Sequence, residues 1–356
     1  MSEQAATPGG AAPDKTSPPA PPVSEGSPGT GSRGGQTQSR AVGMARQLLF
    51  RYGLVVAFLV MLAVFSLLKP HVFPTGENAK AILEEAAPPA ILAIGLTAVL
   101  VMNDFDLSFG SMLGVGSGLV TILLVNHHIG WVLAVIIVLL VGIAGGVVNG
   151  VLIAVLGGSS FIITLAMGTV LTGVEYAITK QQDIFSGMPA SFTSISQNSP
   201  ILGINNQVWI ALVIGVIVWV LLEKTEIGRF MYAIGGNSEA ARLAGIRVRT
   251  LRIFGFVIIG MAAIVAGVLI TSLGGSYTPN PGPPYLLPAY AGVFLGAAAF
   301  KPGQFNVLGT IVGVLFLECI QTGLTMLSLS TWIINVVQGA ILIVAVLLSR
   351  LGEGAA

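Results

Sequence analysis

The sequence predicts an all-α polytopic membrane protein with about ten transmembrane helices. Of its 356 residues, 54% are hydrophobic and only 9% are charged, whereas a soluble domain carries about a quarter charged residues. The apolar residues fall into repeated runs of about twenty, the length that an α-helix needs to cross a bilayer. A net charge of +1 leaves no basic footprint for nucleic acid, and a single cysteine excludes a disulfide framework.

The first 43 residues differ in composition from the rest. Residues 1–43 are rich in Pro, Gly, Ser, Ala and Gln and have almost no large apolar side chains. Such a segment cannot bury enough surface to offset the entropy of ordering. No apolar stretch near the start would act as a signal peptide, so we expect a disordered tail on the cytosolic side. Residues 44–356 then form the transmembrane domain.

Ten apolar runs follow the tail. The predicted spans are 50–68, 83–102, 108–125, 131–156, 160–179, 207–222, 253–271, 286–300, 305–327 and 331–349. Basic residues are retained on the cytosolic side of membrane spans, and an amino terminus inside leaves only Lys69, Lys80 and Lys180 outside. Ten crossings return the carboxyl terminus to the cytosol. We therefore expect a multi-pass protein with both termini cytosolic, surrounded by membrane lipid.

The largest predicted cytosolic loop spans residues 223–252. It holds six of the sixteen Lys and Arg residues. That bias alone has a plain explanation, because basic residues hold loops inside in nearly every multispanning protein. The order of residues within the loop is more informative.

A short capped helix is predicted inside this loop, over residues 238–244. Asn237 or Ser238 offers a side-chain oxygen at the helix start, and Glu239 lies in the first turn, where the helix dipole favours an anion. Gly245 suits the left-handed position after the last turn.

The predicted helix is amphipathic. Ala240, Leu243 and Ala244 fall on one face, and Glu239 and Arg242 lie three residues apart beside it. A short helix of this kind can fit a groove on a soluble partner, with the apolar face giving contact area and the ions giving register.

The stretch GRFMYAIGGNSEAARLAGIRV, residues 228–248, resembles the cytosolic loop of ABC importer permeases of the carbohydrate-uptake branch, which includes ribose, xylose and autoinducer permeases. In that family the loop carries a coupling helix that docks on the ATP-hydrolysing subunit. The resemblance implies this role for Gly235, Gly236, Asn237, Ser238, Glu239, Ala240, Arg242, Leu243 and Gly245. It also implies a bacterial plasma membrane, a sugar substrate, a separate ABC ATPase subunit, an extracytoplasmic solute-binding protein and a second permease subunit, identical or not.

A second polar stretch, NDFDLSFGS, interrupts the apolar sequence at residues 103–111. Carboxylates within a membrane segment are tolerated chiefly where they face protein or water. The segment is either a short cytosolic turn or a helix break that lines a solute path. The family pattern here is Gly-Ile-Asp-Leu-Ser-Val-Gly-Ser, which this stretch resembles, with Asp104 where a glycine is usual. The candidate path residues are Asn103, Asp104, Asp106, Ser108 and Ser111.

The chain also contains a weak internal repeat. Gly146-x-x-x-Gly150 recurs as Gly309-x-x-x-Gly313, and SFIITLAMG at 160–168 recurs as TWIINVVQG at 331–339. The first GxxxG runs outside to inside in our topology and the second runs inside to outside. An inverted repeat of spans two to five and seven to ten is therefore expected, although close helix packing explains each single glycine as well.

The motifs that are missing limit the chemistry. No Gly-Lys pair exists from which to build a P-loop, so we expect a non-catalytic subunit that depends on a separate ATPase. His71, His127 and His128 read as solvated loop residues, and no metal site or cofactor is expected. The outer segment 180–207, with Lys180 and Asp183, is the candidate docking site for a binding protein. The alternative is a proton-coupled secondary transporter that uses Asp104 or Asp106.

Overall fold

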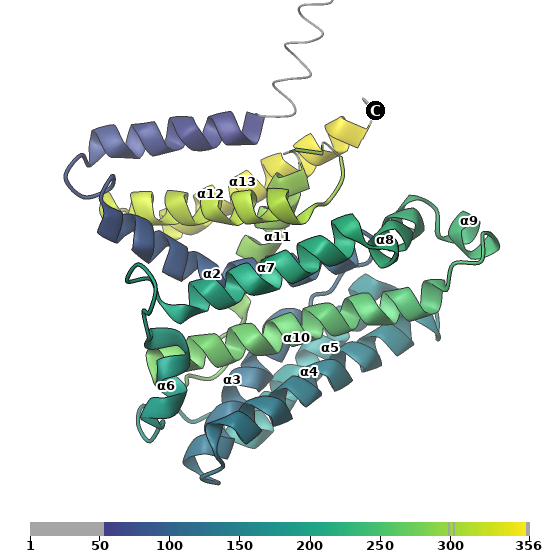
Figure 1. The fold of residues 1–356 in the computed structure, drawn as a ribbon, viewed down its shortest axis with the longest axis horizontal. Coiled ribbons are helices and arrows are strands. Elements are labelled where there is room, and N and C mark those ends of the chain that lie inside the picture. Colours follow the sequence, from purple (N-terminus) through teal and green to yellow (C-terminus); the bar gives the residue numbers. More distant parts are fainter. Residues whose placement is uncertain (1–52, 298–299, 302, 354–356) are drawn as a thin grey trace, which may run out of the picture. The chain divides into compact units, whose positions relative to one another are not determined.

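The computed structural model describes residues 53–297, 300–301 and 303–353 (Figure 1). Over these residues the chain is helical with short connections, and the only β-structure within them is two isolated bridges, Ile184 with Tyr277 and Ile201 with Ile204. The predicted all-α fold is therefore confirmed for this part of the chain. The expected tail, residues 1–43, lies outside the described residues.

The helices in chain order are Gly53–Leu68, α2 (Gly76–Leu100), α3 (Phe109–Val125), α4 (Trp131–Ala154), α5 (Ser160–Thr179), α6 (Ala190–Gln197), α7 (Asn206–Lys224), α8 (Glu226–Gly236), α9 (Ser238–Leu243), α10 (Val248–Gly274), α11 (Pro283–Ala297), α12 (Val307–Met326) and α13 (Thr331–Glu353).

Each of the ten predicted spans coincides with a helix. Six helices are long and apolar enough to cross a membrane, namely α2, α4, α5, α7, α10 and α12. By contrast α3 has 17 residues and α11 has 15, fewer than the roughly twenty that a full crossing takes. The chain is thus a polytopic membrane protein in which α3 and α11 are short helices, and the described part of the first predicted span, Gly53–Leu68, is short as well.

The start of α2 lies further upstream than the predicted residue 83. Thr75 caps the helix, because its hydroxyl accepts a hydrogen bond from the backbone N–H of Asn78 at 3.2 Å. The Asn78 side chain also donates to the carbonyl of Phe73 at 2.8 Å. Glu77 and Lys80 occupy the first turns, so the beginning of this helix is too polar to show in an apolar run.

Two helices, α6 and α8, were not predicted. The segment 180–207 was expected to be a plain loop, but α6 packs on α10 within it through buried hydroxyls. Ser196 donates to the carbonyl of Leu269 at 2.9 Å, and Ser272 donates to the carbonyl of Phe192 at 2.8 Å. In Figure 1, α6 lies at one end of the long helices, and α8 and α9 lie at the other.

Helix packing agrees with the predicted inverted repeat. α2 packs against α10, α3 against α5, and α4 against α10 in the first half; in the second, α11 packs against α13 and α12 against α2. If α2, α3, α4 and α5 are exchanged in order with α10, α11, α12 and α13, the helix contacts of the first half become those of the second half. α2 ends where α10 begins, so the two central helices run in opposite directions (Figure 1).

The two GxxxG motifs serve close backbone contact, but not at equivalent interfaces. A Cβ added to Gly146 would lie 2.5 Å from the carbonyl oxygen of Phe256 on α10. A Cβ added to Gly313 would lie 2.2 Å from the carbonyl oxygen of Gly292 on α11. Only glycine fits at either position, and the plain packing role of these residues is sufficient to explain them.

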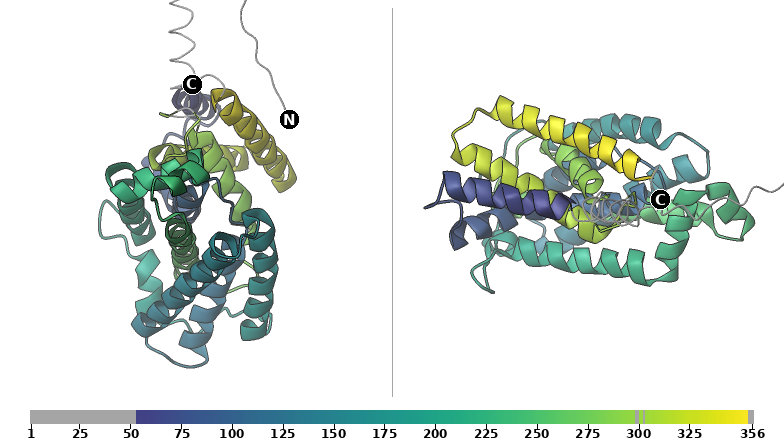
Figure 2. Two further views of the ribbon diagram at one scale, coloured as in Figure 1. Left: turned by 90° about the vertical axis from the view of Figure 1, so that its right-hand side faces the viewer. Right: turned by 90° about the horizontal axis from the view of Figure 1, so that it is seen from above.

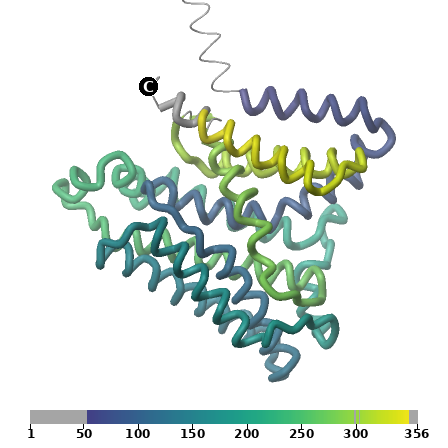
Figure 3. Tube along the Cα trace, turned by 180° about the vertical axis from the view of Figure 1, so that it is seen from behind, coloured from purple at the N-terminus to yellow at the C-terminus, as the bar shows by residue number. Residues whose placement is uncertain are grey.

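The two short helices, α3 and α11, begin next to each other. A Cβ on Gly282, just before α11, would lie 1.8 Å from the carbonyl oxygen of Gly110 at the start of α3. The non-helical connections 101–108 and 275–282 thus lead to two helix starts that touch. Figure 3, seen from behind, shows the segment 275–297 running across the longer helices.

The first described helix, Gly53–Leu68, covers α12. Phe58 and Phe316 form an edge-on ring contact with centroids 6.1 Å apart, and Phe65 lies directly over Gly323. Figure 2 shows this helix beside α12 and α13 from above.

Candidate functional site

The short helix α9 is capped as the sequence predicts. The side-chain oxygen of Asn237 accepts hydrogen bonds from the backbone N–H groups of Glu239 at 3.1 Å and Ala240 at 2.9 Å. Gly245 follows with a φ of 84°, the left-handed conformation that glycine adopts without strain. Of the two candidate caps, Asn237 is the one that the fold uses.

The predicted apolar face of α9 is exposed and does not pack against the rest of the described chain. Ala240, Leu243 and Ala244 are exposed, and Leu243 is 78% exposed. Arg242 donates to the two carboxylate oxygens of Glu239 at 3.2 and 2.5 Å, and the guanidinium holds the pKa of that carboxyl below its usual range. A large apolar side chain beside a fixed ion pair suits contact with another protein.

Helix α8 is joined to the α2–α3 connection. The Asn103 side chain donates to the carbonyl of Gly235 at 2.6 Å. A Cβ on Gly235 would lie 2.0 Å from the carbonyl oxygen of Val101, so only glycine permits this approach. Gly236 faces open space, whereas Ala241 of α9 is buried against the chain.

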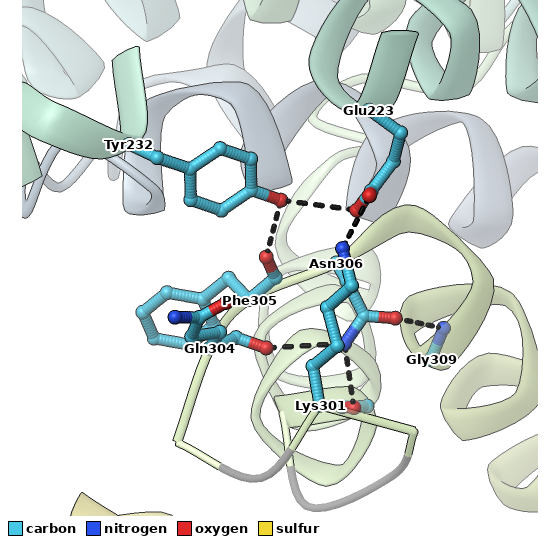
Figure 4. A network of polar contacts seen from close by, with 8 residues as sticks. Glu223, Tyr232, Lys301, Gln304, Phe305, Asn306 and Gly309 are labelled. Carbon is cyan, nitrogen blue, oxygen red and sulfur yellow. Dashed lines mark hydrogen bonds and ion pairs between the residues drawn. The ribbon is translucent and has the colours of Figure 1, made fainter. Parts of the chain in front are cut away.

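A second set of bonds joins α8 to the α11–α12 connection (Figure 4). The Tyr232 hydroxyl donates to the carbonyl of Phe305 at 2.8 Å and to a Glu223 carboxylate oxygen at 3.4 Å. The other oxygen of Glu223 pairs with the Lys301 ammonium. Burial, and then the negative charge of Glu223, raise the pKa of Tyr232 well above its usual value, so this hydroxyl keeps its proton and remains a donor.

Asp104 forms a two-point ion pair with Arg252 of α10. Arg252 Nε lies 2.6 Å from one carboxylate oxygen, and its terminal nitrogen bonds the other. The Asp104 side chain is 2% exposed and that of Arg252 28% exposed. The residue that departs from the family pattern is therefore matched by a cation 148 positions along the chain.

Asp106 makes hydrogen bonds at the start of α3, whereas Asp104 forms an ion pair. One carboxylate oxygen accepts from the Ser108 N–H at 2.7 Å and from the Ser108 hydroxyl at 2.6 Å. Asn149 of α4 donates to the same hydroxyl at 2.8 Å. Tyr290 of α11 donates to the backbone carbonyl of Asp106 at 2.6 Å. The polar stretch thus connects α3, α4 and α11 within the apolar unit.

Ser111 lies in a different environment. Its hydroxyl accepts from Thr172 at 3.0 Å, and both residues line a groove of about 490 Å³ between α3 and α5. Asn103 is exposed. The five candidate path residues therefore do not share one cavity, and a path role for them stays a prediction.

Two buried carboxylates were not singled out from the sequence. Glu175 of α5 is fully buried and accepts hydrogen bonds from the Tyr277 hydroxyl at 2.8 Å and the Asn280 N–H at 2.7 Å. Glu318 of α12 is 6% exposed. Its atom Oε2 has no hydrogen-bond partner among the described residues. The rule applied to Asp104 and Asp106, that a carboxylate in apolar sequence needs a polar reason, also applies to these two.

Short helices that meet within the bundle, paired internal halves and buried carboxylates are typical of helical membrane transport proteins. Residues 78–346 match the family described as "Branched-chain amino acid transport system / permease component". The chain belongs to this family of ABC transporter permeases.

The comparison with curated proteins adds three relatives. The chain is 33% identical over 299 residues to the ribose import permease protein RbsC of Escherichia coli K12, covering 83% of this chain and 92% of the relative. It is 34% identical over 312 residues to the L-arabinose ABC transporter permease protein AraH of Azospirillum brasilense, covering 88% and 91%. It is 31% identical over 302 residues to the D-allose transport system permease protein AlsC of E. coli K12, covering 85% and 92%. No solved structure matches the chain.

Membership in this family agrees with the resemblance carried by residues 228–248. The family description names branched-chain amino acids, while the three relatives are named for sugars. Apolar helices and permease relatives together make this a multi-pass inner-membrane protein.

Proposed function

We propose that this chain is the membrane subunit of an ATP-driven importer for a monosaccharide and that α9 is the helix through which a separate ATPase drives it. The observation that carries the proposal is α9 itself: a capped helix with an exposed apolar face, placed at one end of the unit. The names of the relatives supply the solute class, because they are permeases for ribose, arabinose and allose.

The end that carries α8 and α9 is the cytosolic end in this proposal. Four of the basic residues there, Arg229, Arg242, Arg247 and Arg249, are exposed, as expected for a loop retained in the cytosol. The opposite end, with α6, then faces the extracytoplasmic side and receives a solute-binding protein. Both termini remain cytosolic under this assignment, and a second permease subunit completes the path.

The bonds made by α8 support a coupling role. It contacts the α2–α3 connection through Gly235 and the α11–α12 connection through Tyr232. An ATPase that moves α9 would therefore act on the chain next to both short helices. Allosteric coupling requires an element of this kind, whose position both sites influence.

The proton-coupled alternative is less favoured by the geometry. A proton carrier has to release and rebind its proton during each cycle. Asp104 is instead held by Arg252 at two points, and Asp106 is bonded twice to Ser108. These contacts suit fixed structural carboxylates.

The test is co-purification of the full chain with its neighbouring ATPase and binding protein in detergent. Glu239→Lys is expected to abolish retention of the ATPase, because it places two cations side by side on α9. The matched control is Glu77→Lys, which reverses the charge of another exposed i,i+3 pair, with Lys80, at the opposite end. Equal retention by wild type and Glu239→Lys would contradict the proposed docking surface.

A further inference from the structure

A cavity lined by both polar and apolar side chains lies between α2, α11, α12 and α13. It has a volume of about 630 Å³, and a second cavity of about 490 Å³ shares Tyr285, Glu318, Gln321 and Thr325 with it. A volume of this order is typical of small-molecule sites. The α2–α3 connection singled out from the sequence, residues 101–108, lines neither cavity.

Polar residues follow helical spacing on two membrane helices and meet across the cavity. On α12, Glu318, Gln321 and Thr325 repeat at three and four residues and line both cavities. On α13, Asn335 and Gln338 are three residues apart and line the larger cavity, and the Gln338 amide donates to Gln321 at 2.7 Å. A polar stripe on a membrane helix is costly unless it faces water, protein or a solute.

Two polar atoms at this site lack a partner among the described residues. They are Glu318 Oε2 and the Thr322 hydroxyl, which are one helical turn apart on α12 and both line the smaller cavity. Buried polar atoms are nearly always hydrogen-bonded. A buried acceptor and a buried hydroxyl without partners, on two residues that line the same cavity, therefore point to a hydrogen-bonding ligand there.

The cavity lies toward the end that carries α6. Its walls include the end of α12 and the beginning of α13, with Thr325 and Thr331. On the side of the cavity that faces the α9 end, aromatic rings of α11 and of the connection after it pack against one another. Tyr290 packs on Phe294 with centroids 6.4 Å apart, and Phe294 packs on Phe305 at 5.4 Å. Polar lining on one side and packed rings on the other describe a site reached from the α6 side.

We infer that this cavity is the solute site of the permease and that the Glu318 carboxylate accepts hydrogen bonds from the hydroxyl groups of a neutral polyhydroxylated solute. This inference rests on the proposed import function. Glu85 also lines the smaller cavity, and no Lys or Arg is found among the described residues that line either one. Carboxylates without a cation repel sugar acids and sugar phosphates, whereas the Tyr285 ring offers an apolar face for a sugar ring.

The first experiment measures access of water-soluble reagents. Cys319 is replaced by alanine, and single cysteines are introduced in the full chain at Asn335, which lines the cavity, and at Val336, which is 63% exposed beside it on the outer face of α13. A membrane-impermeant, charged thiol reagent added outside is expected to label Asn335→Cys and to leave Val336→Cys unlabelled. Gln321→Cys serves if Asn335→Cys does not fold. Absence of labelling at both cavity positions overturns the inference.

The second experiment measures transport by the complete importer in liposomes. Radiolabelled D-ribose is the probe, followed by L-arabinose and D-allose. Glu318→Gln removes the charged acceptor but keeps the shape, and we expect uptake to fall at least about tenfold, since a hydrogen bond to a charged group is worth that factor or more. Retention of the ATPase should be unchanged. Uptake within about twofold of wild type, with the ATPase bound, would refute a solute role for Glu318.

Failure of the proposed function gives a different result. If wild-type chain retains no ATPase and supports no ATP-driven uptake, import by this mechanism is excluded whatever the cavity does. If the ATPase binds and uptake proceeds but the cavity cysteines stay unlabelled, the importer stands and its solute path lies elsewhere.

Discussion

The ion pair between Asp104 and Arg252 permits a quantitative prediction. The Asp104 carboxylate is 2% exposed and bonded at two points, so Arg252→Ala leaves a buried, unpaired charge. Breaking a buried pair in this way costs roughly 3 to 5 kcal/mol. The matched control is Arg229→Ala, which removes an ion pair with Glu226 at 3.5 Å whose side chains are 65% and 77% exposed. An exposed pair contributes only about 0 to 1 kcal/mol.

The assay is thermal unfolding of the purified chain in detergent, followed by tryptophan fluorescence. Arg252→Ala is expected to lower the midpoint by about 10 °C, while Arg229→Ala changes it by a few degrees at most. The double variant Asp104→Gly/Arg252→Ala, which carries the glycine of the family pattern, should recover most of the loss because no charge is left unpaired. Equal midpoints for Arg252→Ala and Arg229→Ala would refute a buried, two-point pair.

Three further predictions follow from single contacts. Gly282→Ala should prevent stable folding, because its Cβ would lie 1.8 Å from a backbone oxygen of α3, whereas Gly173→Ala, with open space around it, should leave the elution profile in detergent unchanged. Asn237→Ala removes the α9 cap and should weaken that helix by about 1 kcal/mol; it should lower the affinity for the ATPase without changing yield, and an unchanged affinity would show that the cap is dispensable for docking. Tyr290→Phe loses the 2.6 Å bond to the Asp106 carbonyl and should cost about 1 to 3 kcal/mol of stability, since a buried acceptor is left open; a midpoint equal to wild type would mean that another donor replaces it.

Local chemistry explains why parts of the candidate site could be predicted. The cap at Asn237 and the left-handed Gly245 depend only on residues a few positions away, and such signals are visible in a single sequence. Span positions were predictable for the same reason, because long apolar runs identify membrane helices. The errors fell where a helix start is polar, as at Thr75, and where a short helix such as α6 depends on α10 for its stability.

Long-range partners could not be predicted in this way. Nothing near Asp104 indicates that Arg252 neutralises it, because the two residues are brought together only by the antiparallel packing of α2 and α10. The same limit applies to Glu318, whose neighbours in the cavity come from four helices. A carboxylate in an apolar run shows that a polar environment exists, but the fold decides whether that environment is an ion pair, a backbone bond or an open cavity.

The arrangement of α8 explains how a single docking helix could act on both halves of the repeat. Asn103 joins α8 near its end to the connection that leads to α3, and Tyr232 joins it near its middle to the connection that follows α11. Since α8 is one continuous helix of 11 residues, a translation of the helix shifts both contacts. A displacement of α9 that carries α8 with it therefore reaches both connections together. Because the start of α3 touches the start of α11 at Gly110 and Gly282, a shift of either short helix displaces the other, and this contact would link the two halves in the proposed switch of access.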